Sequence, residues 1–478
     1  MGAEIQCITG LFTKYYGRKP DSIDALPPSG SYRKYFRLKF DKESYIGVYN
    51  EDKKENVAFL SFTQSFLVAG LNVPEIIAED IDRNVYIIQD LGDVTLLDFI
   101  NSQDNEIIIT QESISIYKKV IEQLPGFQIK GKEAIDFSVC YPRNAFDRQS
   151  MMWDLNYFKY YFLKLAKIPF DEQKLENDFM TFCDYLLTAD CDYFLYRDFQ
   201  SRNVMIFNND PYFIDYQGGR RGALQYDIAS ILFEAKTSLP AEVRQELLKF
   251  YISELSKHLK FDKQAFLDLY YGYVFIRLMQ AMGAYGFRGL YEKKKLFLQS
   301  IPKAIIHLAW LRTNIKLPIS LPELERVWDN LITSHQINEI ADSTTNLTIN
   351  INSFSYKNGV PTDETANGGG FVFDCRALEN PGKLEQYKNF NGKDLPVINF
   401  IESNHESSEF IENIFSIIDN VIKSYKKKNY THLMVNLGCT GGQHRSVYSA
   451  EKLAGHIRIK YPEINIAIRH REIEKKSK

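Results

Sequence analysis

A polar, weakly periodic stretch near residues 336–347 divides this 478-residue chain into two parts with different patterns. Before this stretch, strand-like runs precede long helical segments. After it, strand-like and helical segments alternate along the chain. A chain of this length exceeds what one hydrophobic core can organise. We therefore expect an α+β domain over residues 1–335, a linker at 336–347 and an α/β domain over 348–478.

Composition narrows the class of protein. The chain is 45% hydrophobic and 25% charged, as is usual for globular proteins, and its net charge is −3, so contact with nucleic acid would need a local basic patch. Its six cysteines form no CxxC pair, which argues against a zinc ribbon or a disulfide framework. We see no signal peptide and no uncharged apolar run long enough for a membrane, so a cytoplasmic protein without membrane contact is expected.

The N-terminal part divides further into a small lobe, at about residues 1–92, and a helical lobe, at about 93–335. The small lobe shows the periodicity of helices at 1–17 and 55–70 and of strands at 35–40, 44–49 and 84–92. Within the helical lobe, residues 192–219 differ, because they favour short β segments around a hairpin turn at 208–211.

Three polar residues in that exceptional segment suggest phosphoryl transfer. Asp198 and Asn203 have the D-x-x-x-x-N spacing of a kinase catalytic loop, and Asp215 follows twelve residues later at the end of a strand-like run. Phosphoryl transfer needs a carboxylate for the acceptor hydroxyl and oxygen ligands for Mg²⁺. The spacing alone is equally compatible with polar loop residues, but the strand context and the second carboxylate favour a site.

The segments around these residues resemble the aminoglycoside phosphotransferase/choline kinase superfamily, and within it the N-acetylmuramate/N-acetylglucosamine anomeric kinases. The matching segments are SGSYRKYFRL (29–38), AGLNVPEIIAED (69–80), IIQDLGDVTLLDFI (87–100), YRDFQSRNVM (196–205), FIDYQGGRRGALQYDIASIL (213–232) and FIRLMQAMGAYGFRGL (275–290). The resemblance implies a bilobal protein-kinase-like domain that uses ATP and Mg²⁺ on a sugar. It implies Asp198 as catalytic base and Asn203 and Asp215 as metal ligands.

The same resemblance implies a nucleotide site in the small lobe. A phosphate-covering loop would comprise Ser31, Tyr32, Arg33 and Lys34, and an inter-lobe hinge would include Gln89, Asp90 and Leu91. Asp227 would be a structural or substrate-ordering acid, although a helix-capping aspartate is equally plausible.

Two departures from the family pattern are visible. Tyr196 stands where many members have histidine, and SYIGVY (44–49) lacks the lysine with which protein kinases grip phosphate. Arg33, Lys34 or Arg37 could supply that charge, and we favour Arg33. These departures leave open an alternative, a non-catalytic adapter with a pseudokinase domain.

A second candidate site follows a buried strand-like run in the C-terminal part. A glycine-containing loop between strand and helix presents backbone N–H groups to an anion, and its side chains add hydroxyl and charged donors. It lacks the G-K-[ST] of a Walker A loop. The expected phosphate-binding residues are Cys439, Thr440, Gly441, Gly442, Gln443, His444, Arg445 and Ser446.

This loop has two chemical interpretations. Cys439 and the following Arg445-Ser446 have the spacing of a cysteine-dependent phosphatase, in which a thiolate attacks phosphorus. However, Gly438 stands where such enzymes have histidine, and no general-acid aspartate is evident. We therefore favour phosphate binding without catalysis.

Residues 348–478 resemble the C-terminal domain of the RapZ family of RNase adapter proteins. The matching segments are FSYKNGVP (354–361), FVFDCRALENP (371–381), GCTGGQHRSVYSAEKLA (438–454) and RHREIEKKSK (469–478). The resemblance implies sensing of glucosamine 6-phosphate, and RNA contact through the basic end, at Arg469, Arg471, Lys475 and Lys476. A solvated chain end is the simpler interpretation of that segment. Gly382 and Lys383 depart from the family, which tends to have histidine soon after Asn-Pro.

Together these features predict an ATP- and Mg²⁺-dependent kinase that phosphorylates an amino sugar at its anomeric hydroxyl during cell-wall recycling. The C-terminal domain would sense a related sugar phosphate. The alternative is the adapter, which would bind RNA or a protein partner.

Overall fold

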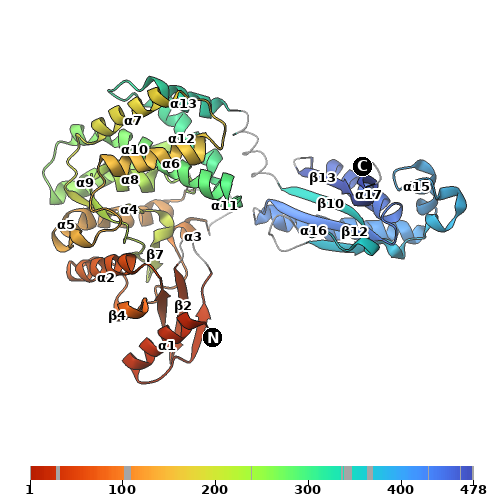
Figure 1. Ribbon diagram of the computed structural model, residues 1–478, viewed down its shortest axis with the longest axis horizontal. Coiled ribbons are helices and arrows are strands. Elements are labelled where there is room, and N and C mark those ends of the chain that lie inside the picture. Colours follow the sequence, from red (N-terminus) through yellow and green to blue (C-terminus); the bar gives the residue numbers. More distant parts are fainter. Residues whose placement is uncertain are drawn as a thin grey trace. The chain divides into compact units, whose positions relative to one another are not determined.

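The computed structural model describes residues 2–27, 33–101, 109–237, 239–334, 337, 347–362, 370–428, 430–462 and 464–475. The chain forms two compact units, Met1–Ile337 and Asn338–Lys478, each considered by itself (Figure 1). The division falls within the segment expected as a linker, of which residues 337 and 347 are described.

The small lobe is a five-stranded antiparallel sheet with a helix on it. Apolar side chains of α1, including Ile8 and Phe12, pack with Leu38 and Ile87 of the sheet. Helix α1 ends at Gly17, whose φ of 78° lies in the left-handed region that glycine adopts readily. In spatial order the strands are β1 (Ser22–Ala25), β2 (Lys34–Phe40), β3 (Glu43–Tyr49), β5 (Val85–Gln89) and β4 (Ile76–Asp80), and α1 spans Ala3–Tyr16.

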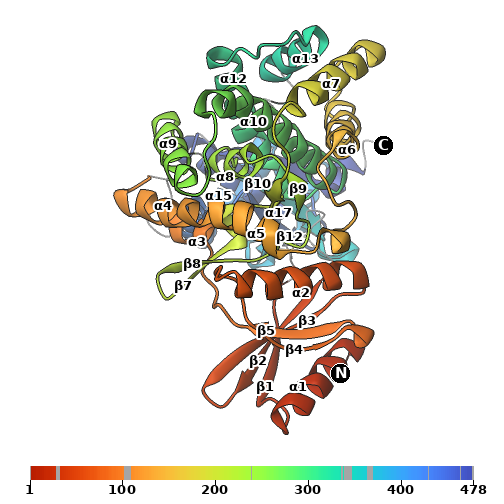
Figure 2. The ribbon, with the colours of Figure 1, turned by 90° about the vertical axis from the view of Figure 1, so that its left-hand side faces the viewer.

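Helix α2 (Lys53–Val68) joins this sheet to the helical lobe, and it lies between the two in Figure 2. It begins where the Asp52 carboxylate accepts the backbone N–H groups of Lys54 and Glu55, at 3.0 and 3.1 Å. Further along, the Phe59 ring stacks on Tyr216 with 5.3 Å between centroids. The body of α2 therefore contacts the segment that carries Asp215.

The helical lobe surrounds two short hairpin-like pairs of strands. Its helices are α3 (Leu96–Asn101), α4 (Gln111–Pro125), α5 (Gly131–Ala134), α6 (Arg148–Phe158), α7 (Glu172–Leu186), α8 (Gln225–Leu232), α9 (Ala241–His258), α10 (Lys263–Tyr285), α11 (Lys295–Leu298), α12 (Ser300–Asn314) and α13 (Pro322–Thr333). Strands β7 (Val204–Phe207) and β8 (Asp210–Phe213) pair around Asn208 and Asn209, both with positive φ, and β6 (Tyr193–Leu195) pairs with β9 (Arg220–Gly222). The predicted hairpin and the two-lobed α+β architecture are confirmed.

The C-terminal unit is an α/β domain with a parallel four-stranded sheet, also as predicted. In spatial order the strands are β11 (Phe371–Asp374), β12 (His432–Cys439), β10 (Thr348–Ser355) and β13 (Asn465–His470). Its main helices are α15 (Leu395–Glu402), α16 (His405–Lys427) and α17 (Arg445–Lys460). Because all four strands run the same way, their carboxyl ends meet at one edge, where ligands of such sheets bind.

Sequence patterns missed part of this unit. Helix α15 and strand β13 were not predicted, and residues 469–474 are not a solvated end. Arg469 lies in β13 opposite Asn352 of β10, and α18 (Arg471–Glu474) follows directly. The sequence did not indicate this strand because it has only two alternating apolar residues, Ile466 and Ile468, before the basic segment begins. Lys476 lies outside the described residues.

No helix within the described ranges is both long enough and apolar enough to cross a membrane.

His307 of α12 provides a pH-dependent test of the helical lobe. Its ring is 3% exposed and its Nδ1–H donates to the Phe233 carbonyl at 3.1 Å, and burial lowers its pKa from 6.5 to about 4. Between these values the unfolded chain binds a proton that the folded one rejects, so stability falls as pH drops from 7 to 4. The free energy of unfolding should therefore fall by up to about 3 kcal/mol less in His307→Gln than in the unaltered chain over this pH range, as measured by urea unfolding at each pH. Equal pH slopes in both proteins would contradict it.

Candidate active site and anion-binding loop

The predicted catalytic residues occupy one connected loop system after β6. The Asn203 side-chain amide donates to the Asp198 carbonyl at 2.8 Å, and its backbone carbonyl accepts the Ile214 N–H at 3.0 Å. Asn203 is 6% exposed, so these bonds form in a largely water-excluded place. The structure thus brings Asp198, Asn203 and the strand end that carries Asp215 together.

Asp227 of α8 holds the backbone just before Asp198. Its two carboxylate oxygens accept the N–H groups of Tyr196 and Arg197, at 2.8 and 3.0 Å. Burial raises the pKa of this carboxyl to about 7, and the two backbone donors oppose that rise. Asp227 therefore has a structural role, and its contacts are not those of the helix cap that was the alternative.

Tyr196 and Arg197 extend this support. The Tyr196 hydroxyl donates to the Ile214 carbonyl at 2.6 Å and so links the loop to the end of β8. The Arg197 guanidinium forms a bidentate pair with Asp154 of α6, at 2.6 and 2.8 Å, with both side chains largely buried. Because Arg197 has φ +81°, an uncommon conformation, this pair helps to fix the backbone that presents Asp198.

Asp215 lies in an environment suited to a cation. Burial raises the pKa of its carboxyl, and the nearby negative charge of Asp198 raises it further, while Arg33 and Arg202 act in the opposite direction. Gln217 donates to one carboxylate oxygen at 2.7 Å. Two acids that repel each other beside an amide oxygen match the hard oxygen ligands of Mg²⁺.

Mg²⁺ in phosphoryl-transfer sites is normally held by one or two protein side chains, with phosphate oxygens and water completing its shell. Within the described ranges no group of three or more His, Cys, Asp and Glu side chains gathers as a metal site. Asp215 and Asn203 offer two oxygen-bearing side chains, the number that such a site uses.

The three candidate charges near the phosphate-covering loop have different partners. Arg37 pairs with Asp90 and Asp93, and Lys34 pairs with Glu4 of α1. Arg33, whose side chain is 3% exposed, instead lies 3.1 Å from Glu55 of α2, and Asp215 is among the charges that raise its pKa. Of the three candidates, Arg33 is thus the one that is buried and paired with α2. Ser31 and Tyr32 lie outside the described residues.

In protein kinases a strand lysine pairs with a helix glutamate to position the phosphates. Here Arg33, directly before β2, pairs with Glu55 in the first turn of helix α2. Sequence reasoning missed Glu55. Its signal was the D-x-x-E pattern of Asp52 and Glu55, which reads first as a helix start.

The hinge residues have mainly structural contacts. The Asp90 carboxylate accepts hydrogen bonds from Arg37 at 2.7 Å, from Ser44 at 2.8 Å and from the Gly92 N–H at 3.0 Å. The Gln89 N–H donates to the Glu75 carbonyl, and Leu91 is buried. The Asp90 side chain therefore shapes the turn between the lobes.

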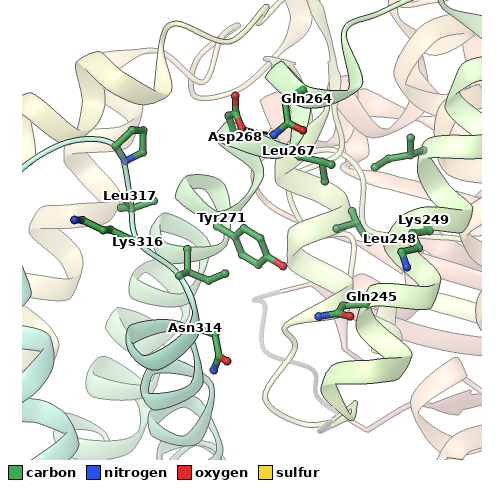
Figure 3. A pocket seen from close by; sticks show the side chains of 13 residues that line it. Gln245, Leu248, Lys249, Gln264, Leu267, Asp268, Tyr271, Asn314, Lys316 and Leu317 are labelled. Carbon is green, nitrogen blue, oxygen red and sulfur yellow. Dashed lines mark hydrogen bonds between the residues drawn. The ribbon is translucent and has the colours of Figure 1, made fainter.

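The helical lobe also has an open pocket of about 710 Å³ between α9, α10 and residues 314–318 (Figure 3). Polar groups of Gln264, Asp268 and Tyr271 face it beside leucine side chains. None of the predicted catalytic or nucleotide-binding residues lines it. This pocket therefore shares no lining residue with the group of Asp198, Asn203 and Asp215.

In the C-terminal unit, residues 438–446, here called the anion loop, connect the carboxyl end of β12 to α17. Gly442 has φ +68°, and a Cβ there would lie 2.4 Å from Glu472 and 2.8 Å from the Ser355 nitrogen. The Thr440 carbonyl accepts the Ser355 hydroxyl at 2.7 Å. Only glycine fits this bend, which turns the loop back over the sheet edge and towards the start of α17.

The charged and polar side chains of the anion loop have distinct contacts. Arg445 is 5% exposed and donates from Nη1 to the carbonyls of Arg376 and Leu378, both at 3.0 Å. His444 is 3.2 Å from the Tyr387 carbonyl, and the Gln443 carbonyl accepts the Gly392 N–H at 2.8 Å. Gln443, His444 and Arg445 thus all link the loop to residues 376–392.

Basic residues at the C-terminal end have acidic neighbours. Arg469 pairs with Glu474 at 2.9 Å, and Lys475 lies 3.8 Å from Glu472. These contacts reduce the positive field that RNA contact would need.

Comparisons with known proteins bear on the two units separately. Residues 347–474 match the family model of the RapZ C-terminal domain. The resemblance of this unit is confirmed. Proteins called nucleotide-binding protein from Hahella chejuensis and Nitrosomonas europaea are 35% and 42% identical over 138 and 134 residues, which are 29% and 28% of this chain. The chain spans 46% and 44% of those relatives, less than half their length.

Similar solved structures include two kinases. The choline kinase LicA from Streptococcus pneumoniae has 14% identity and a TM-score of 0.45, covering 65% of this chain and 100% of that one. The aminoglycoside phosphotransferase APH(2'')-Ib has 13% identity and a TM-score of 0.43, covering 71% and 99%.

Proposed function

We propose that the N-terminal unit transfers the γ-phosphoryl group of ATP to a hydroxyl of a small molecule. The observation that supports this most is the connected set of Asp198, Asn203 and Asp215, which hydrogen bonds and neighbouring charges tie into one loop system. A loop of unrelated polar residues would have no reason to hold two acids close together in a partly buried place.

Each residue has a distinct role in this proposal. The Asp198 carboxylate orients the acceptor hydroxyl and takes its proton as the oxygen attacks phosphorus. Asn203 and Asp215 would hold Mg²⁺, which when bound neutralises charge on the phosphate oxygens. Arg33, kept in place by Glu55, would contact the phosphates from the small lobe.

The acceptor we propose is an amino sugar such as N-acetylmuramate or N-acetylglucosamine, phosphorylated at the anomeric hydroxyl during cell-wall recycling. Support comes from the sequence segments around Asp198, Asp215 and Asp227. The test is to incubate the full chain with ATP, Mg²⁺ and a panel of sugars, alcohols and aminoglycosides, and to identify the phosphorylated product. Consumption of no acceptor in the panel would contradict the kinase.

For the C-terminal unit we propose binding of a sugar phosphate such as glucosamine 6-phosphate at the anion loop. The start of α17, the backbone of Gly441 and the hydroxyl of Thr440 provide the donors that a phosphate needs. Calorimetric titration with glucosamine 6-phosphate, glucosamine and orthophosphate would show whether the phosphate group carries the affinity.

A second candidate function is the non-catalytic adapter, favoured by the match to a RapZ C-terminal domain and by the absent strand lysine. It predicts RNA binding that weakens steeply with salt, together with no ATP-dependent product. The paired charges of Arg469 and Lys475 make this the less favoured candidate.

Replacing Arg33 tests the nucleotide site. We expect Arg33→Met to raise the KM for ATP by about 10- to 100-fold, because a buried charged hydrogen-bond donor to phosphate is lost. Lys34→Met serves as the matched control, since Lys34 pairs with Glu4 and should leave the KM nearly unchanged. A larger effect at Lys34 than at Arg33 would overturn the assignment.

A further inference from the structure

The cysteine of the anion loop has contacts that binding a phosphate does not require. Cys439 is 2% exposed, and its Sγ accepts the Gly442 N–H at 3.2 Å. The Ser446 hydroxyl lies 3.2 Å from the same sulfur. One backbone N–H thus donates to the sulfur, a hydroxyl lies within hydrogen-bond distance of it, and both are beside the amino end of a 16-residue helix. Cysteine nucleophiles commonly lie at such helix ends.

Arg445 provides an independent observation that points to a ligand. Its Nη1 is engaged by two carbonyls, whereas its Nε, although buried, has no hydrogen-bond partner among the described residues. Its Nη2 lies 3.5 Å from the Thr440 hydroxyl, so the edge that Nε shares with Nη2 faces the anion loop. That edge of a guanidinium is the one that binds a phosphate through two parallel hydrogen bonds.

The sulfur, the unpartnered arginine edge and the loop amides all belong to the short anion loop at the carboxyl end of β12. We propose that the C-terminal unit hydrolyses aryl phosphomonoesters through a covalent phosphocysteine at Cys439. This goes beyond the phosphate binding and phosphotransfer proposed above and does not depend on ATP.

The reaction balances in two steps. The Cys439 thiol first gives its proton to solvent, the thiolate forms an S–P bond, and the ester P–O bond breaks with its electron pair leaving on the aryl oxygen. A water oxygen then attacks phosphorus, the S–P bond breaks, and orthophosphate and the thiolate are released. Arg445 and the loop N–H groups hold the phosphoryl oxygens, and the Ser446 hydroxyl stabilises the departing thiolate.

The leaving group sets the substrate class. Asp374, the acid at this sheet edge opposite Gly438, pairs with Arg376, which lowers the pKa of its carboxyl. It is therefore ionised at neutral pH and supplies no proton to an alkoxide. The oxygen of an acidic phenol such as 4-nitrophenol leaves as a stable anion without a proton, whereas a sugar 6-phosphate would bind and remain intact. The sugar phosphate should consequently inhibit aryl phosphate hydrolysis competitively.

The test uses the full chain with 4-nitrophenyl phosphate, without ATP and with EDTA, and follows nitrophenolate and orthophosphate release. We expect Cys439→Ser to reduce hydrolysis by about 10³-fold or more. Cys375→Ser, which alters another buried thiol of this unit, should hydrolyse as the unaltered chain does. Acid quenching during turnover should leave a phosphate adduct on the peptide that contains Cys439.

Folding of each variant is checked by its thermal unfolding and by orthophosphate binding. Hydrolysis no faster than without protein, or equal hydrolysis by Cys439→Ser, would overturn the proposal. Orthophosphate binding without any adduct would show a binding loop only and also overturn it. Loss of the ATP-dependent reaction has no bearing on this assay, so failure of either proposal can be distinguished.

Discussion

Replacing Asp198 by asparagine is expected to reduce ATP-dependent phosphorylation by about 10³-fold while leaving nucleotide affinity nearly unchanged. The amide keeps the shape of the side chain but cannot take the acceptor's proton. The Asn203 amide would still find its partner, because it bonds to the Asp198 carbonyl and not to the carboxylate. Product formation with saturating acceptor, together with calorimetric titration of ATP, separates the chemical step from binding.

Asp192→Asn provides the matched control for that experiment. Asp192 lies six residues earlier, and its exposed carboxylate pairs with Lys132 and Arg221. Loss of an exposed pair should cost no more than about 1 kcal/mol and should leave turnover unchanged. If Asp198→Asn retained the turnover of the control, Asp198 would not be the base and the adapter would become the better explanation.

The second large effect expected is on stability, from Asp154→Ala. This change removes the partner of Arg197, whose side chain is 14% exposed, and leaves a buried positive charge beside the catalytic loop. Breaking such a pair usually destabilises a protein by about 3–5 kcal/mol. Urea unfolding followed by fluorescence should show this loss in the N-terminal unit, with a parallel fall in turnover.

Two further variants separate charge from volume. Asp184→Ala removes an exposed partner of Arg148 and should cost no more than about 1 kcal/mol. The double variant Asp154→Leu/Arg197→Met should regain most of the stability that Asp154→Leu alone loses, because no buried charge remains unpaired. Turnover should stay low in the double variant, since Arg197 no longer orients the backbone at Asp198. If Asp154→Ala or Asp154→Leu were as stable as the unaltered protein, the argument from the buried Arg197–Asp154 pair would be refuted.

Local patterns predicted the secondary structure near Asp198 and Cys439 well, for a physical reason. The hairpin at 204–213 is specified by Asn208 and Asn209, which tolerate positive φ, and the turn at the end of β12 by Gly442. Few residue types tolerate positive φ, so positions that require it can be recognised from the sequence. Strand β13 could not be recognised in this way, because it is short, has only two isoleucines and runs through Arg469 and His470 into the basic end of the chain.

Partnerships across the fold could not be predicted from spacing. Nothing near Asp154 in sequence indicates Arg197, 43 residues away, and nothing near Glu55 indicates Arg33. Glu4 of α1 pairs with Lys34, and Asp90 at the hinge pairs with Arg37. Of the three candidate charges, Arg33 is the one that pairs with Glu55. Ion pairs between distant segments depend on how those segments pack, and packing has no local signature.

The sequence by itself determined the two-part organisation, the chemistry-bearing types at 198, 203 and 215, and the turn-forming glycines of the anion loop. These follow from period, spacing and backbone freedom, which are local properties of the chain. Only the tertiary structure decided that Asp227 holds a backbone, that Arg33 pairs with Glu55, and that Ser446 and Gly442 both reach the Cys439 sulfur. Hydrogen bonds and charge pairs join whatever folding brings within a few ångströms, and that neighbourhood exists only once the core has formed.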